Sequence, residues 1–195
     1  MHASDIPDAS AELVVAARDG DRAAFDELVK LTYVATYTLA LRLTNNEEDA
    51  RDVTQEAYLR AYRGLRNYRG DAQFTTWLYR ITANCASTFT TGRSRHRHET
   101  IDDYVQVADL RAEADVEGLA GSGELRDRLA QAVATLPPRL RAVVVLRDVY
   151  DLPHEAIAAE LGISVSATKV RLHRARHKLR AELFPGLDEV DARAV

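Results

Sequence analysis

The sequence contains few of the residues that interrupt regular structure or cross-link a chain. Its 195 residues include five prolines, nine glycines and one cysteine, Cys85. A lone cysteine excludes an internal disulfide bond and is typical of a reducing compartment. No apolar run approaches the roughly 18 residues of a membrane helix, and residues 1–15 lack the basic and apolar segments of a signal peptide. We therefore expect a cytoplasmic protein with long regular elements and no membrane span.

Sustained alternation of apolar and polar residues is also missing, which argues against β-sheet. Apolar residues instead recur at spacings of three and four, as on one face of an α-helix. The predicted helices span residues 10–20, 21–44, 47–64, 74–92, 124–136, 138–150, 154–161 and 164–183. The expected N-caps of the first, third and fourth helices are Ser10, Asn46 and Asp71. The stripe expected to face the core from the second helix consists of Phe25, Leu28, Val29, Leu31, Val34, Thr38 and Leu41. The predicted fold class is all-α.

The chain is acidic overall, with a net charge of −4, but the charge is unevenly distributed. Residues 96–126 carry eight acidic and three basic side chains and include the turn-forming sequence GLAGSG. Such a segment is typical of a flexible linker. We therefore divide the chain into two helical domains, residues 1–94 and 127–185, joined by a flexible acidic linker at residues 95–126. Residues 186–195 form a C-terminal tail.

One basic helix contrasts with this acidic background. Residues 164–183 contain six Lys or Arg residues and no acidic residue before Glu182. The preceding helix, residues 154–161, ends at Gly162, and Ser164 can cap the basic helix. A short helix, a glycine turn and a longer helix form the helix-turn-helix pattern, whose second helix enters the DNA major groove. The sequence therefore predicts a DNA-binding C-terminal domain.

Helical spacing divides the basic helix into two faces. The face expected to pack inward consists of Val165, Thr168, Leu172, Ala175, Leu179 and Leu183. The side chains that we assign to base edges are Ser166, Lys169, Val170 and His173. The side chains that we assign to DNA phosphates are Arg171, Arg174 and Arg176. The alternative interpretation is a solvated basic face on a structural helix.

Two longer segments carry a resemblance to a known family. Residues 136–180 read LPPRLRAVVVLRDVYDLPHEAIAAELGISVSATKVRLHRARHKLR, and residues 49–89 read DARDVTQEAYLRAYRGLRNYRGDAQFTTWLYRITANCASTF. The first segment resembles the domain that binds the promoter −35 element in bacterial RNA polymerase sigma factors of the extracytoplasmic-function (ECF) type. The second resembles the other domain of these factors, with its D-x-x-Q-E and F-x-T-W-L-x-R-I-x-x-N motifs. Two motifs in the family's order make the resemblance specific, whereas a lone helix-turn-helix would not.

The resemblance implies an alternative sigma factor that binds RNA polymerase core, recognises both promoter elements and promotes DNA melting. It implies that Asp52, Gln55 and Glu56 dock on the clamp helices of the largest polymerase subunit, and that the polymerase flap is also contacted. The residues implied in binding the −10 element are Arg66, Tyr68, Arg69, Asp71, Gln73, Arg80 and Asn84. An anti-sigma factor is a further implied partner. No cofactor and no catalytic residue is expected.

The residues alone leave two other functions open. One is a stand-alone helix-turn-helix transcriptional regulator that binds duplex DNA without polymerase. The other is an enzyme that uses the Cys85 thiol, or a metal held by His96 and His98 with the acidic residues that follow them. Cys85 lies on the apolar side of its predicted helix, so we favour a buried structural cysteine. For His96 and His98 we favour a polar start of the linker.

Overall fold

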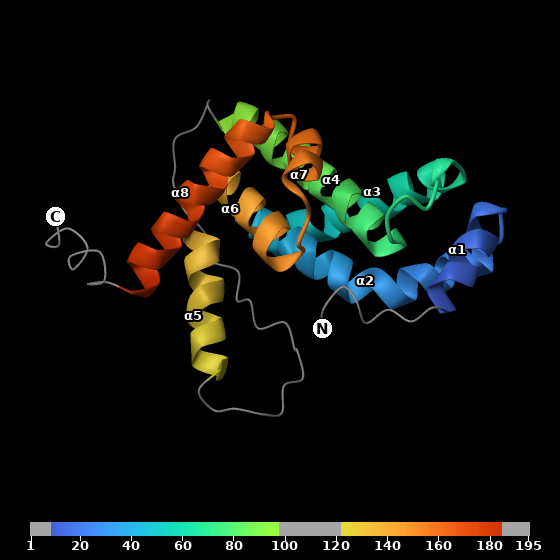
Figure 1. The fold of residues 1–195 in the computed structure, drawn as a ribbon. Helices are drawn as coiled ribbons and strands as arrows, with labels where there is room; N and C mark the ends of the chain where they lie inside the picture. The colour runs from blue at the N-terminus through green and yellow to red at the C-terminus, as the bar shows by residue number, and fades with distance from the viewer. Residues whose placement is uncertain (1–8, 98–121, 185–195) are drawn as a thin grey trace, which may run out of the picture. The chain divides into compact units, whose positions relative to one another are not determined.

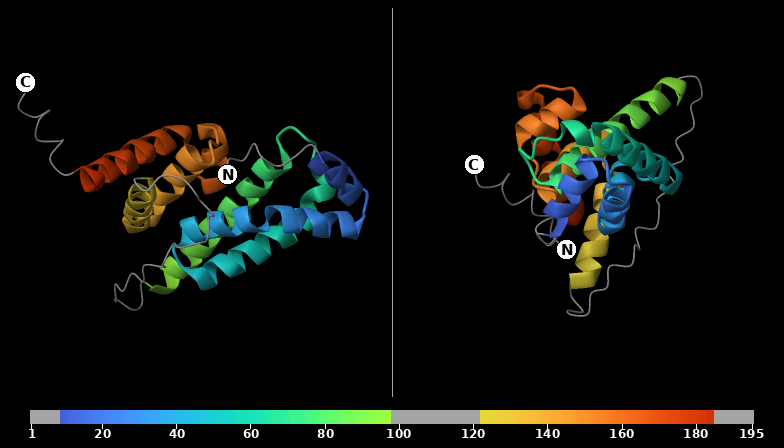
Figure 2. Two further views of the ribbon diagram at one scale, coloured as in Figure 1. Left: turned by 90° about the horizontal axis from the view of Figure 1, so that it is seen from below. Right: turned by 90° about the vertical axis from the view of Figure 1, so that its right-hand side faces the viewer.

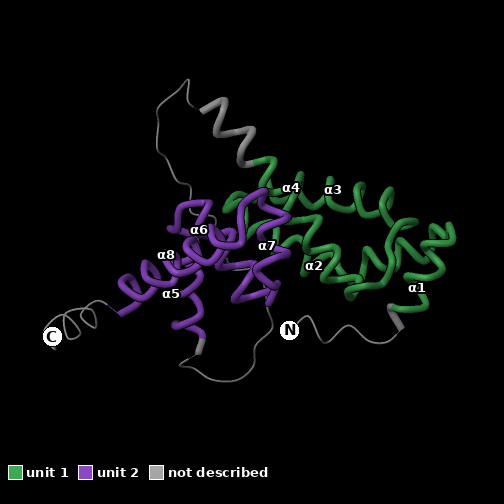
Figure 3. Tube along the Cα trace, turned by 45° about the horizontal axis from the view of Figure 1, so that its top comes forward, with its two compact units in different colours: residues 1–102 green, residues 103–195 purple. Residues whose placement is uncertain are grey.

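The computed structural model describes residues 9–97 and 122–184, and every regular element in these two ranges is helical (Figure 1). The predicted all-α class is therefore confirmed. The chain divides into two compact units, residues 1–102 and residues 103–195 (Figure 3). In the part of the chain that the structure describes, no helix is both long and apolar enough to span a bilayer.

The first unit is built on three long helices that pack side by side (Figure 2). Its elements are α1 (Ala9–Arg18), α2 (Arg22–Thr44), α3 (Glu47–Gly64), the 3₁₀ turn η1 (Leu65–Asn67) and α4 (Phe74–Arg97). Helices α2, α3 and α4 all contact one another, while α1 packs on α2 and on η1. The side chains of Leu28, Leu39, Val53, Leu65 and Leu78 are almost completely buried in this unit.

Side-chain caps define several helix ends in the first unit. The Asp21 carboxylate accepts from the backbone N–H groups of Ala23 and Ala24 at the start of α2. Asn45 ends α2 in the left-handed conformation, with φ of 55°. The Asn46 side chain accepts from the Asp49 N–H at 3.0 Å, which confirms the predicted cap of α3. Such caps satisfy backbone donors that have no partner within the helix.

Three predicted helix ends were wrong. Helix α1 begins at Ala9, so Ser10 lies within it and does not cap it. Helix α4 begins at Phe74, where the Gln73 carbonyl accepts from the Trp77 N–H, so Asp71 lies too early to be the cap. The same helix runs to Arg97 and passes through the glycine at which we expected it to end. A helix interior tolerates one glycine at a cost of about 1 kcal/mol, so glycine alone does not stop it.

The buried face of α2 also differs from the predicted stripe. Leu31 and Val34 are 51% and 74% exposed, whereas Thr32 and Thr36 are buried. Each threonine hydroxyl donates to a carbonyl one turn earlier in its own helix, at 2.6 Å from Thr32 and 2.8 Å from Thr36. Both hydroxyls also lie within hydrogen-bonding distance of the Tyr58 hydroxyl on α3. Because these groups are satisfied, their burial carries little penalty.

The second unit comprises α5 (Ser122–Thr135), α6 (Pro138–Val144), the π-helical segment η2 (Val145–Val149), α7 (His154–Leu161) and α8 (Val165–Leu183). Helices α5, α6 and α7 all pack against α8. Arg141 of α6 is buried, and its guanidinium donates to the carbonyl of Ala134 at 2.9 Å. Desolvation lowers the pKa of Arg141 to about 10. The arginine thus ties the end of α5 to α6.

Candidate functional site

Helix α8 presents its basic face outward. The preceding helix α7 ends at Gly162, whose φ of 62° is a left-handed conformation that favours glycine. The Ser164 hydroxyl then accepts from the Ala167 N–H at 3.1 Å and starts α8. The inward residues Thr168, Leu172, Ala175 and Leu179 are buried, and Val165 and Leu183 are half-buried. The predicted helix-turn-helix geometry and the inward face are therefore both present.

The side chains assigned to base edges lie together on the opposite face of α8. Ser166, Lys169, Val170 and His173 are all exposed, as is Arg174. Val170 is 49% exposed, although an apolar side chain gains by burial. An exposed apolar side chain between a lysine and a histidine suits a surface that meets base edges, where thymine methyl groups offer apolar contact.

The arginines assigned to phosphates differ in their surroundings. Arg171 is half-buried on the flank of α8. Arg176 pairs with Asp148 of η2 through two hydrogen bonds, of 3.0 Å from Nε and 2.5 Å from Nη2. Because the Asp148 carboxylate accepts these hydrogen bonds, the pKa of Arg176 is raised. Sequence spacing did not reveal this pair, because its members lie 28 positions apart.

The residues assigned to polymerase docking lie on the outer flank of α3. Asp52 and Gln55 are exposed, and Glu56 is half-buried. The exposed side chain of Leu59 follows them one turn later on the same helix. The Glu56 carboxylate accepts from Arg60 at 2.6 Å, an ordinary i,i+4 ion pair of a helix surface.

Most of the residues assigned to −10 DNA lie in the loop between α3 and α4 or at the start of α4. The exposed members are Arg66, Arg69, Asp71 and Gln73, and the half-buried members are Tyr68, Arg80 and Asn84. The Tyr68 hydroxyl donates to the carbonyl of Ala72, and its ring lies 5.1 Å from the ring of Trp77 and 6.2 Å from that of Phe74. Burial raises the pKa of Tyr68. The three rings form one cluster that shapes the loop.

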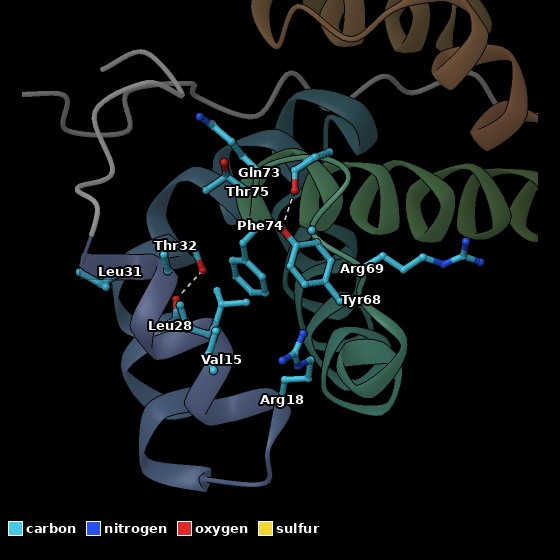
Figure 4. Close-up of a pocket in the computed structure, with 14 residues that line it drawn as sticks. Val15, Arg18, Leu28, Leu31, Thr32, Tyr68, Arg69, Gln73, Phe74 and Thr75 are labelled. Carbon is cyan, nitrogen blue, oxygen red and sulfur yellow. Dashed lines mark hydrogen bonds between the residues drawn. The ribbon is translucent and has the colours of Figure 1, made fainter.

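A cavity of about 470 Å³ lies between this loop and the first two helices (Figure 4). Its walls include Val15 of α1, Leu31 of α2 and the aromatic rings of Tyr68 and Phe74. Polar side chains also line it, among them Arg18 and Gln73. Sequence reasoning missed this cavity, because it depends on how α1 packs against the loop.

The thiol and metal interpretations find no support in the described residues. The Cys85 side chain is 2% exposed, and burial raises the pKa of its thiol to about 11. Within residues 9–97 and 122–184, no three His, Cys, Asp or Glu side chains are grouped as a metal site would require. His98 and the side chain of His96 lie outside the residues that the structure describes.

Comparison with known families gives two matches in this chain. Residues 28–96 match Sigma-70 region 2, and residues 126–179 match Sigma-70, region 4. The first region contains the α3 flank and the loop before α4, and the second contains the helix-turn-helix. The order of the two matches is the order expected from the sequence motifs.

Several curated proteins are similar over most of the chain. The ECF RNA polymerase sigma factor SigE of Mycolicibacterium smegmatis is 38% identical over 165 residues, which cover 83% of this chain and 63% of that protein. The RNA polymerase sigma-H factor of Pseudomonas aeruginosa is 35% identical, covering 91% of this chain and 95% of that protein. The ECF RNA polymerase sigma-E factor of Escherichia coli K12 is 32% identical, with 89% and 93% covered.

Two solved structures are similar in fold. CnrH, solved in complex with the cytosolic domain of CnrY, is 27% identical with a TM-score of 0.55, covering 96% of this chain and all of that chain. The sigma factor RpoE of Bartonella quintana, solved with the anti-sigma factor NepR, has a TM-score of 0.62 at 20% identity, covering 83% of this chain and 98% of that chain.

Proposed function

The chain belongs to the sigma-70 family, as an alternative sigma factor of the ECF type, and we propose that it directs RNA polymerase to promoters through two separate DNA-reading surfaces. The first unit docks on the core enzyme in the cytoplasm and reads the −10 element. The second unit reads the −35 element. The chain itself performs no chemistry, because the polymerase does.

The outward face of α8 is the observation that carries this proposal. It exposes Lys169, Val170, His173 and Arg174 on one long helix that follows a tight glycine turn. A major groove admits one α-helix, and the N-terminal half of a recognition helix meets base edges. Arg174 then lies far enough along the helix to meet phosphate. This face is the −35-reading surface of the proposal.

The first unit offers the complementary surfaces. The flank of α3 with Asp52, Gln55 and Glu56 is the proposed contact with the polymerase clamp helices. The loop and the start of α4 supply arginines for the DNA backbone and polar groups for bases. The cavity behind the loop has apolar and aromatic walls with polar groups among them, which suits one unstacked base of the melted strand.

Paired substitutions test the assignment of the two units. We expect Lys169→Ala with His173→Ala to abolish −35-dependent transcription and to leave core binding intact. We expect Gln55→Ala with Glu56→Ala to abolish core binding and to leave −35 DNA binding by the second unit intact. In vitro transcription and pull-down of core polymerase measure the effects in the first variant, and pull-down of core with fluorescence anisotropy of −35 DNA measures them in the second. Loss of core binding in the first variant, or loss of −35 DNA binding in the second, contradicts the separation of roles.

Filling the cavity tests its role in DNA melting. Val15 is 49% exposed and lines the cavity, so Val15→Trp should fill it without disturbing the buried core. We expect this variant to bind core normally and to open the −10 element poorly, as measured by permanganate reactivity of unpaired thymines. The matched control is Val34→Trp, which adds the same ring at an exposed apolar position outside the cavity. If the two variants open the −10 element equally well, the cavity has no role in DNA melting.

We also propose a protein inhibitor of the anti-sigma class as a partner of this chain. The similar protein CnrH was solved in complex with the cytosolic domain of CnrY, and the family resemblance implies an anti-sigma factor as a partner of this chain. The test is competition, in which a candidate inhibitor domain should displace core polymerase from this chain in proportion to its concentration. A candidate that binds the chain together with core is not such an inhibitor.

A further inference from the structure

Arg18 of α1 lines the cavity behind the loop but has no separate role in the proposed function. The described residues that line this cavity include two arginines, Arg18 and Arg69, and none of them is acidic. In Figure 4 the Arg18 side chain rises from α1 toward Tyr68, whereas Arg69 extends away from the other labelled side chains. Arg18 also lies before residue 28, where the match to Sigma-70 region 2 begins. The packing of α1 thus brings to the cavity a guanidinium that the sequence motifs did not single out.

The surroundings of Arg18 leave its charge weakly compensated. Its side chain is 42% exposed, and its ion-pair partner, Asp19, is 69% exposed. The distance of 3.8 Å between Arg18 Nε and Asp19 Oδ1 is too long for a hydrogen bond. Exposed ion pairs of this kind contribute little to stability. An anion that reaches the cavity can therefore replace Asp19 as the partner of Arg18 at little cost.

An unstacked nucleotide brings two different surfaces to such a site. Its base is flat and can stack on aromatic walls like those of Tyr68 and Phe74, whereas its phosphate is charged and is costly to bury without a partner. Arg18 both lines the cavity and is partly exposed, so it lies at the rim, where the phosphate of an inserted base remains in contact with solvent. A guanidinium suits this position, because it can donate two parallel hydrogen bonds to phosphate oxygens.

We propose that Arg18 binds one backbone phosphate of the melted −10 strand, next to the nucleotide whose base enters the cavity. The ligand is a phosphodiester of single-stranded DNA, and the contact does not depend on the identity of the base. Helix α1 is then part of the DNA-binding surface as well as a wall of the first unit. This role of Arg18 rests on the proposed function, in which the cavity takes an unstacked base.

The test removes one phosphate charge at a time from the DNA. Holoenzyme assembled from core polymerase and the full chain binds fork-junction DNA whose −10 non-template strand is single-stranded, and each phosphate of that strand is replaced in turn by a neutral methylphosphonate. At the linkage that meets Arg18, we expect the wild type to lose affinity about fivefold, the upper range for an exposed ion pair. Arg18→Gln should bind unmodified DNA more weakly by a similar factor and lose nothing further at that linkage.

Two further variants separate a direct contact from a general effect of charge. Arg18→Lys keeps the positive charge, so we expect it to retain the loss at that linkage. The matched control is Arg22→Gln, which removes the charge of an exposed arginine at the start of α2 that is not among the cavity residues. We expect this control to show the wild-type loss at every linkage. In a salt series, Arg18→Gln should reduce the slope of log affinity against log salt by about 0.7, the contribution of one phosphate on a single strand.

The outcomes distinguish the role of Arg18 from the role of the cavity. If Val15→Trp opens the −10 element as well as its control, the cavity takes no base, and Arg18 loses its proposed ligand as well. If Val15→Trp impairs opening while Arg18→Gln shows the wild-type loss at every linkage, Arg18 alone is wrongly assigned. The assignment is equally wrong if Arg18→Lys behaves like Arg18→Gln, or if Arg22→Gln abolishes the loss at the same linkage.

Discussion

Cys85 shows how burial sets the chemistry of a single side chain. Its thiol is buried in the first unit, and desolvation raises its pKa from 9.0 to about 11. Since the thiolate is the reactive form, we expect the native chain to resist a maleimide at about pH 8 and to react only after unfolding. Labelling followed by mass spectrometry measures this difference.

The same pKa shift has a consequence for stability. Folding favours the neutral thiol, so the contribution of Cys85 to the stability of the fold is fully present below the ordinary pKa and is lost as pH rises from about 9 to about 11.

Cys85→Ser with unchanged transcription excludes a thiol-dependent enzyme. Rapid labelling of the native chain contradicts the buried structural cysteine.

Arg174 and Arg176 lie on the same basic helix but have different surroundings. Arg174 is exposed, whereas Arg176 already pairs with Asp148. Each phosphate contact contributes about one to the slope of log affinity against log salt. We expect Arg174→Ala to reduce the slope for −35 DNA by about one, and Arg176→Ala to change it less, because releasing Arg176 from Asp148 offsets its gain from phosphate.

Fluorescence anisotropy across a salt series measures both slopes for the second unit. Asp148→Asn serves as the companion variant, since it frees Arg176 and removes a negative charge near the DNA. We expect it to bind −35 DNA more tightly and with a steeper slope. Equal slopes for the two arginine variants would show that Asp148 does not hold Arg176 away from DNA.

At the scale of one element, the stability of α8 depends on its N-cap, the residue directly before the helix. The Ser164 hydroxyl accepts from the Ala167 N–H and also lies 2.9 Å from the Ser166 hydroxyl. Replacing an N-cap serine by alanine costs about 1 kcal/mol, which lowers the melting temperature of a domain of this size by about 4–8 °C. We expect this loss in Ser164→Ala, measured by thermal circular dichroism of the second unit.

The control for the cap is Ser164→Asp. A carboxylate also caps a helix and interacts well with its N-terminal dipole, so we expect it to keep the stability of the second unit. It places a negative charge at the DNA-facing end of α8, however, and we expect it to weaken −35 binding. If both variants melt like the wild type, the hydroxyl does not cap the helix.

Local patterns predicted most elements but not every buried face. The helix-turn-helix followed from the glycine turn, the serine cap and the inward spacing of Leu172, Ala175 and Leu179. On α2, in contrast, spacing placed Val34 inside and ignored Thr36. A hydropathy pattern does not show which threonine donates to its own helix and can therefore be buried. The partner hydroxyl on Tyr58 belongs to another helix and is invisible to a local pattern.

The candidate site shows the same difference between features of a single helix and contacts between elements. Residue types and motif spacing predicted the outward face of α8 and the flank of α3, because each lies on one helix. The contacts between elements were not predictable in this way. They include the pair of Arg176 with Asp148, the hydrogen bond from Arg60 to Asn84, and the cavity behind the loop, all of which depend on tertiary packing.

At the scale of the whole molecule, each of the two compact units buries apolar side chains of its own. The first buries Leu28, Leu78 and their neighbours among α1 to α4, and the second buries Leu146 and Ile157 among its own helices. Each unit also carries one proposed DNA-reading surface. A small surface of this kind binds weakly alone, and joining two in one chain raises the effective concentration of the second after the first has bound.

This arrangement predicts that promoter-specific transcription depends on the covalent link between the two units, and that supplying both units as separate fragments does not replace this link. We expect fragments of residues 1–102 and 103–195, each checked for helicity by circular dichroism, to support far less promoter-specific transcription when mixed than the intact chain at equal concentration. The deficit should be on the order of a hundredfold or more and should shrink as the second fragment is raised toward millimolar concentration. If equimolar fragments at micromolar concentration supported transcription as well as the intact chain, the polymerase would recruit the second unit through contacts of its own. The tether would then contribute little.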